Sequence, residues 1–117
     1  MISEKIYNLL PAEMPKYIGD LPSAPEVAVA IMEYNSGVGT EYFAESGSLF
    51  SPVVKIVVRH TSYELGSTWS EQIKEALHKY HDDFFLSILI VGTPIYLGRD
   101  EQKLHEFQGI FKTQVKE

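Results

Sequence analysis

Apolar side chains recur at every second position in two stretches of this chain, and period-two spacing is what a half-buried β-strand requires. The stretch PVVKIVVR, which begins at Pro52, sets Val54, Ile56 and Val58 on one face against Lys55 and Arg59 on the other. The C-terminal stretch LHEFQGIFKTQVK repeats the pattern with Phe107, Phe111 and Val115 on its apolar side. Both patterns need a sheet with one covered face, so β-structure is the first constraint on the fold.

Three further segments have strand character. EVAVAIMEYN is apolar on both faces, which favours a strand in the middle of a sheet, although its alanines also permit a helix. FFLSILIVG predicts a buried strand with Phe84, Leu86, Ile88 and Ile90 on one face. This run is far shorter than the roughly 20 residues that span a membrane. TPIYLGRDE predicts a short strand followed by a turn at Gly98.

Two segments predict helices. Ser3 can cap a short helix that runs to Leu10. The segment TWSEQIKEALHKY gives the stronger signal, because Thr68 and Glu71 form the pattern of a capping box. Its apolar positions fall on one stripe, made of Trp69, Ile73, Ala76, Leu77 and Tyr80.

The order of these segments is helix, strand, long connection, strand, helix and then two or three strands. The sequence therefore predicts an α+β fold in one domain, residues 1–117, with a mixed or mostly antiparallel sheet and two helices packed on one face. The long connection, residues 35–52, holds three glycines and several large apolar residues: Tyr42, Phe43, Leu49 and Phe50. We interpret it as a long hairpin arm or flap that contacts a neighbouring subunit.

Composition excludes several classes of protein. The 117 residues include no cysteine, which removes disulfides, thiol catalysis and thiolate metal sites. A formal net charge of -6 argues against a protein that grips nucleic acid. The N-terminal MISEKIYNLLP lacks the basic and apolar regions of a signal peptide. We expect an acidic, soluble, intracellular protein.

The segment HKYHDD is a candidate metal site. His78 and His81 are three residues apart, which puts them on the same side of a helix, and Asp82 or Asp83 would add a carboxylate. Capping of the helix C-terminus by these side chains is the favoured explanation. A small metal-binding enzyme that uses His78, His81 and Asp82 is kept as an alternative.

Catalytic motifs are absent from the sequence. A hydrolase set of Ser62, His60 and Asp82 or Asp83 has no Gly-x-Ser-x-Gly context, and Ser62 is better explained as a turn residue. The glycine pair in GVGTEYF lacks the third glycine and the strand-to-helix context of a dinucleotide site. The sequence predicts no catalytic residue, no bound metal and no cofactor.

The segment RHTSYE is open to two explanations. Arg59 projects opposite the apolar face of its strand, and Tyr63 and Glu64 begin a turn toward the helix. Arg59 either pairs with Glu64 or another acid inside the subunit, or lies with Tyr63 at a protein–protein contact, where both residue types are enriched.

Several segments together resemble a known family. PVVKIVVRHTSYELG, the EQIKEAL helix and GTPIYLGRDEQKLHEF are similar to the small minor capsid proteins of long-tailed bacteriophages of Gram-positive hosts, within the wider tail-terminator and tail-completion group. EKIYNLLP and DLPSAPEVAVAIMEYNSG fit the same pattern, so the resemblance covers nearly the whole chain.

The resemblance implies a non-enzymatic phage or prophage virion protein, made in the bacterial cytoplasm and placed at the head–tail junction or the tail end. Family members form rings, commonly sixfold, that stop growth of the tail tube. The implied partners are further copies of the chain, the tail-tube protein and the head-completion protein, with no membrane. A head-completion or connector protein is the alternative. The predicted subunit-interface residues are Arg59, Tyr63, Glu64, Tyr42, Phe43, Leu49 and Phe50.

The charge of the chain adds an expectation about such a ring. DNA must pass through it without binding, and an acidic wall repels phosphate. The predicted channel-facing acids are Glu41, Glu45, Asp82, Asp83, Asp100 and Glu101. The alternative is that these acids only keep a small protein soluble.

Overall fold

A computed structural model describes residues 2–19, 26–34, 49–50, 53–99 and 103–116. The helices of these residues are α1 (Ile2–Leu9) and α3 (Tyr63–Leu77). The strands are β1 (Lys16–Ile18), β2 (Ala28–Tyr34), β3 (Leu49–Phe50), β4 (Val53–His60), β5 (Phe85–Ile90), β6 (Ile95–Arg99) and β7 (His105–Lys116).

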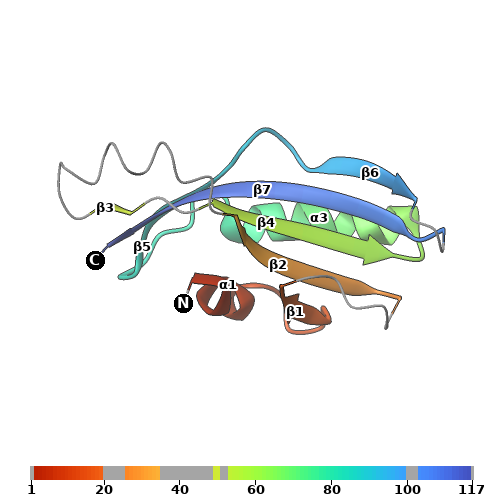
Figure 1. The fold of residues 1–117 in the computed structure, drawn as a ribbon, viewed down its shortest axis with the longest axis horizontal. Coiled ribbons are helices and arrows are strands. Elements are labelled where there is room, and N and C mark those ends of the chain that lie inside the picture. The colour runs from red at the N-terminus through yellow and green to blue at the C-terminus, as the bar shows by residue number, and fades with distance from the viewer. Residues whose placement is uncertain (1, 20–25, 35–48, 51–52, 100–102, 117) are drawn as a thin grey trace.

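The strands form one open sheet that is antiparallel except for the pair β1–β2 (Figure 1). From one side the order is β1, β2, β4, β7. β5 and β6 then pair with successive parts of β7, and β3 pairs with the last residues of β7, beyond the stretch that β4 occupies. The long strand β7 thus contacts four other strands and organises the sheet.

Both helices cover the same face of this sheet. α3 lies behind β4 and β7 in Figure 1, and α1 lies beside β1 and β2. Their apolar sides meet the strands in one buried core, which includes Ile6, Val29, Ile31, Val54, Ile56, Val58, Ile73, Leu77, Phe107 and Phe111. The register places Val58 beside both Val29 and Phe107, so the period-two faces predicted for β4 and β7 are confirmed. The predicted α+β class, with a mostly antiparallel sheet and two helices on one face, is confirmed as well.

Helix α1 begins one residue before its predicted cap. Ser3 lies within the helix, and its N–H and hydroxyl both donate to Oε1 of Glu33, at 3.2 and 3.0 Å. These two bonds tie α1 to β2.

Helix α3 begins earlier than the sequence pattern predicts. Its N-cap is Ser62, whose hydroxyl oxygen accepts the N–H of Leu65 at 3.2 Å. The predicted start at Thr68 is therefore wrong, because Ser62 supplies a cap before the first helical turn. Tyr63 and Glu64 lie inside that turn rather than in a loop between strand and helix.

The predicted apolar face of β5 is wrong at Leu86, whereas Ile88 lies in the core and Phe84 and Ile90 pack against it. A register shift between Phe85 and Ser87 marks a bulge in this strand, and a bulge resets the alternation of side chains. Phe85 and Ile88 are buried, whereas Leu86 and Leu89 are exposed.

Strands β1 and β3 have no signal in the sequence pattern. β1 has only three residues between prolines and is held by parallel pairing with β2, a partner distant in sequence. Of the predicted arm, residues 35–48 and 51–52 lie outside the described residues. Leu49 and Phe50 form β3, which pairs with Val115 and Lys116 of β7. The arm itself stays a prediction.

Candidate subunit-contact surface

β5 and β6 lie one after the other along the outer edge of β7, the edge that faces away from β4 (Figure 1). An outer strand leaves one row of backbone N–H and C=O groups without a strand partner, and such a row is a template for pairing with another chain. The way each outer row is satisfied therefore decides whether the strand is a contact surface.

The outer row of β5 is covered by the segment that follows α3. Lys79, at a φ of 68°, turns the chain back toward the sheet. Its N–H donates to the carbonyl of Ile88 at 2.6 Å, and the N–H of Ile88 donates to the carbonyl of Tyr80 at 3.2 Å. β5 is thus closed on its outer side by the chain itself.

Asp82 completes this cover. One carboxylate oxygen accepts the N–H groups of Phe84 and Phe85 at 2.8 and 2.7 Å, and the other accepts the hydroxyl of Tyr80 at 2.7 Å. Two hydrogen bonds hold the pKa of the Asp82 carboxyl below its ordinary value, because they stabilise its charged form. The bond from the N–H of Phe85 has the larger effect, and the bond from the Tyr80 hydroxyl the next. The hydrogen bond that the Tyr80 hydroxyl donates to Asp82 raises the pKa of Tyr80, and burial and the negative charge of Asp82 raise it further.

The histidine cluster in which a metal site was considered also serves this cover. Nδ1 of His78 accepts the N–H of Ile90 at 3.2 Å, while His81 is exposed. Among the described residues, no three His, Asp or Glu side chains are placed to hold a metal ion. The side chains of His78 and Asp82 therefore bond to the start and end of β5 rather than to the last carbonyls of α3, so the predicted capping by these side chains is wrong. His78 is the C-cap of α3 through its backbone N–H, which donates to the carbonyl of Lys74.

The strand β6 differs from β5 in its outer row, with which no strand among the described residues pairs. Its apolar side chains are exposed, as Leu86 and Leu89 of β5 are: Ile95 by 53 %, Tyr96 by 39 % and Leu97 by 49 %. Tyr63, at the start of α3, is exposed by 49 % and contacts Tyr96. We call Ile95, Tyr96, Leu97 and Tyr63 the β6 surface.

An aromatic cluster fixes the β6 surface to the core. The ring of Tyr63 lies 4.9 Å from that of Tyr96 and 5.3 Å from that of Phe107, and the rings of Tyr96 and Phe107 lie 5.1 Å apart. The hydroxyl of Tyr96 is 2.8 Å from Nδ1 of His105. Aromatic pairs of this kind contribute about 0.5–1.5 kcal/mol each beyond their buried area. Although β6 is exposed, it is therefore held in a defined position.

Gly66 allows this cluster to form. A Cβ atom at Gly66 would lie 2.6 Å from Cε1 of Phe107 and 3.2 Å from Cβ of His60. The first turn of α3 thus rests directly on Phe107, and a side chain here would force the two apart. Gly66 therefore serves close packing inside the helix.

The hydrolase arrangement considered for Ser62 is not formed. The Ser62 hydroxyl oxygen accepts the N–H of Leu65, and Nδ1 of His60 accepts the backbone N–H of Ser62 at 3.0 Å. Asp82 is engaged in the cover of β5. Ser62 is a helix cap, and its neighbours hold the backbone.

The predicted interface residues lie in different environments. Arg59 is buried, and its Nε donates to the carbonyl of Glu26 at 3.1 Å, whereas Tyr63 and Glu64 are exposed. Tyr42 and Phe43 lie outside the described residues, and only the backbone pairing of Leu49 and Phe50 is described. The assignment of these seven residues to an interface stays a prediction.

Of the predicted channel-facing acids, the structure describes Asp82 and Asp83, which are both exposed. Glu41, Glu45, Asp100 and Glu101 lie outside the described residues. Their place in a channel also stays a prediction.

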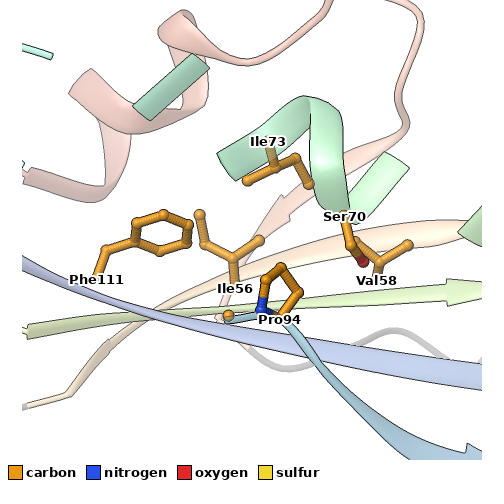
Figure 2. Close-up of a pocket in the computed structure, with 7 residues that line it drawn as sticks. Ile56, Val58, Ser70, Ile73, Pro94 and Phe111 are labelled. Atoms are coloured by element: carbon orange, nitrogen blue, oxygen red, sulfur yellow. The ribbon is translucent and has the colours of Figure 1, made fainter. Parts of the chain in front are cut away.

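A small cavity lies between α3 and the sheet, with a volume of about 10 Å³ (Figure 2). Ser70 and Ile73 of α3 approach it from the helix side, and Ile56, Phe111 and Pro94 approach it from the sheet side. Sites for small molecules usually have roughly 300–1,000 Å³. This cavity is a packing gap that holds one water molecule at most.

Sequence reasoning missed Ile95, Tyr96 and Leu97. Their only signal is a run of three large apolar residues before Gly98 in a short predicted strand. Such a run predicts burial as readily as exposure, because its place at the sheet edge depends on pairing with β7.

An apolar edge strand that has no strand partner among the described residues is a surface suited to contact with another protein chain. The chain matches the model of the bacteriophage tail terminator protein family over residues 4–117, and it therefore belongs to that family. A search of the curated proteins finds no match. The chain is thus a structural virion component with a role in tail termination and contacts to other tail or head proteins. No helix of the described residues is long and apolar enough to cross a membrane.

Proposed function

We propose that this chain ends the phage tail tube by assembling into a homo-oligomeric ring, commonly a hexamer, with the β6 surface as one side of the contact between subunits. The ring binds the tail-tube protein on one side and the head-completion protein on the other. The resemblance to minor capsid proteins of phages of Gram-positive hosts suggests the same host range. The observation that carries the proposal is that the outer row of β6 has no strand partner among the described residues and that the strand exposes apolar side chains.

Two contributions to the free energy of association support this contact. Pairing with the outer row of β6 satisfies its backbone groups and extends the sheet. Ile95 and Leu97 are each about half exposed, and burying the remainder contributes about 1 kcal/mol per side chain.

A closed ring needs two different surfaces on every subunit, because a head-to-tail contact is heterologous. The opposite end of the sheet is the second surface that fits. Within the described residues β1 pairs only with β2, and Ile18 of β1 is exposed by 47 %. In this arrangement β6 of one subunit meets β1 of the next.

The experiment compares wild type with Ile95→Lys and Leu97→Lys by sedimentation velocity over a range of concentrations. A charge in the contact should raise the concentration of half-assembly at least about tenfold, the effect of 1.4 kcal/mol. Urea unfolding should change by no more than about 0.5 kcal/mol, because both positions are exposed in the subunit.

Leu89→Lys is the matched control. Leu89 is exposed by 45 %, but it lies on β5, whose outer row the chain itself covers. It should leave assembly unchanged, and Ile18→Lys should weaken assembly as the β6 variants do. A wild type that stays monomeric, or assembly lost in Leu89→Lys but kept in Leu97→Lys, contradicts the proposed contact.

The acidic channel is a separate part of the proposal. DNA should pass through the ring unbound, so the protein should not be retained on a duplex-DNA column at low salt. Tight binding of the protein to duplex DNA would contradict the acidic channel. Asp82, Asp83 and the other predicted acids would then be ordinary surface charges.

A further inference from the structure

Two histidines face each other behind the β6 surface. His60, the last residue of β4, pairs in register with His105, the first residue of β7. His60 is buried, and its ring lies edge-on to Trp69 of α3, with 4.9 Å between the ring centroids. The pair therefore lies where the first part of α3 and β6 are both attached to the sheet.

Each histidine holds one of these two elements. Nδ1 of His60 accepts the N–H of Ser62 at 3.0 Å, so this nitrogen carries no proton and the residue that caps α3 is fixed. Nδ1 of His105 is 2.8 Å from the hydroxyl of Tyr96, which fixes the middle of β6. Protonation of His60 at Nδ1 removes the acceptor of the Ser62 N–H. The bond between His105 and Tyr96 can form in either direction, because the hydroxyl both donates and accepts.

The surroundings oppose a positive charge at this point. Burial of His60, and then the neighbouring His105, lower the pKa of the His60 imidazole below its ordinary value of 6.5. The free N–H groups at the start of α3 carry a partial positive charge as well. Arg99 of β6 pairs in register with His105, and Lys103 precedes β7.

Among the described residues, few negative groups lie near the pair. Glu64 in the first turn of α3 is exposed. Arg59 and Glu106 precede and follow the pair on β4 and β7, so strand alternation points them to the opposite face of the sheet. Asp100 and Glu101 lie outside the described residues.

The sign of the effect follows from the lowered pKa. The unfolded chain takes up a proton at His60 at a higher pH than the folded chain does. The contribution of neutral His60 to stability is therefore complete above about pH 6.5 and is lost as the pH falls through the lower folded pKa.

We propose that the His60–His105 pair is a proton-sensitive latch: with His60 neutral it holds the start of α3 on the sheet and, through the contact of Tyr63 with Tyr96, supports β6, and proton uptake at His60 loosens both and weakens the subunit contact. The effect on assembly rests on the proposed function. The local release does not, because it depends only on bonds within one subunit.

Hydrogen exchange tests the latch at about pH 7.5 and about pH 5, on either side of the ordinary histidine pKa. After correction for intrinsic exchange, wild type should exchange several-fold faster at the lower pH in peptides covering residues 63–66 and 95–99. Peptides from the centre of β4 should not change. Sedimentation velocity under the same conditions should show loss of the oligomer at the lower pH.

The test variants are His60→Asn and His105→Asn, singly and together. Asparagine offers an oxygen near the position of Nδ1 but does not take up a proton. The double variant should lose the acid-induced exchange and keep the oligomer, whereas His81→Asn, at an exposed histidine, should behave as wild type. Because the smaller side chain can weaken packing against Trp69, NMR titration of the wild-type imidazoles is the second measurement, and it should give His60 a midpoint below 6.5.

Each outcome decides between the alternatives. Unchanged exchange in wild type, an equal response in the double variant, or a His60 midpoint at or above 6.5 overturns the latch. A latch that opens while the oligomer persists overturns its link to assembly. A wild type that is monomeric at both pH values, yet opens through the histidines, rejects the proposed function and leaves the latch standing.

Discussion

β5 and β6 pair with the same edge of β7, yet the backbone groups on their outer sides are satisfied differently. The outer row of β5 is covered by residues 78–82, with Asp82 and His78 bonded to its ends. β6 has an aromatic cluster beneath it and, among the described residues, no strand beyond it. Exposed sheet edges are a liability that proteins usually cover. The outer edge of β6, which has no strand partner among the described residues, is therefore the edge that we propose for contact with another subunit.

The largest expected effect separates the anchor of β5 from the side chains of β6. Phe85 is 1 % exposed and packs in the core, so Phe85→Ala should lower the free energy of unfolding by about 3–5 kcal/mol. Leu97→Ala should change it by no more than about 0.5 kcal/mol. Urea unfolding measures both, and a similar loss for the two variants would mean that β6 belongs to the folding core rather than to a contact surface.

The next effect concerns the support of β6. Gly66→Ala places a Cβ against the ring of Phe107, and overpacking of this kind costs about 1–3 kcal/mol, against about 1 kcal/mol gained in helix propensity. We expect a net loss of about 1 kcal/mol in urea unfolding. The difference between Glu75→Ala and Glu75→Gly, at an exposed position of the same helix, measures the propensity difference alone. Net stabilisation by Gly66→Ala would show that α3 does not rest on Phe107 as described.

The smallest effect concerns the cover of β5 and depends on pH. The lowered pKa of Asp82 means that the unfolded chain binds its proton first as the pH falls, so this carboxylate stabilises the fold above about pH 4 and the contribution is lost below. Asp82→Asn keeps an acceptor for the N–H groups of Phe84 and Phe85 but removes the titration. Its unfolding free energy should therefore fall less steeply between about pH 4 and about pH 2. Asp83→Asn is the control, and an identical slope for wild type and Asp82→Asn would contradict the cover.

The sequence predicted those parts of the fold whose pattern is local and regular. The alternation of Val54, Ile56 and Val58 in β4 and of Phe107 and Phe111 in β7 set the covered face correctly, because these side chains pack in one core. The predicted exposure of the other face of β4 was wrong at Arg59, which is buried. The exposure of Leu86 in β5 was not predicted because a bulge breaks the alternation of that strand. Strand β1 was not predicted because it depends on pairing with β2, a partner distant in sequence.

The start of α3 and the candidate surface were harder to predict for different reasons. Serine and glycine are both common in turns, so Ser62 and Gly66 predict a turn as readily as the start of a helix. Glycine is needed inside α3 because the helix packs closely on Phe107, and this contact is not visible in the sequence. Tyr63 was expected at a contact and is exposed, but Ile95 and Leu97 carried no signal of exposure, since position in the sheet is a tertiary property.

The most direct test of the open edge is hydrogen exchange of the wild-type protein in its assembled form and after dilution to the monomer. We expect assembly to slow exchange in the peptide covering residues 95–99, because the outer row of β6 gains backbone partners. The peptide covering residues 85–90 should be protected equally in both states, since residues 78–82 already close it. Protection gained in β5 or elsewhere, with β6 unchanged, would contradict the claim that β6 is the edge at which subunits meet.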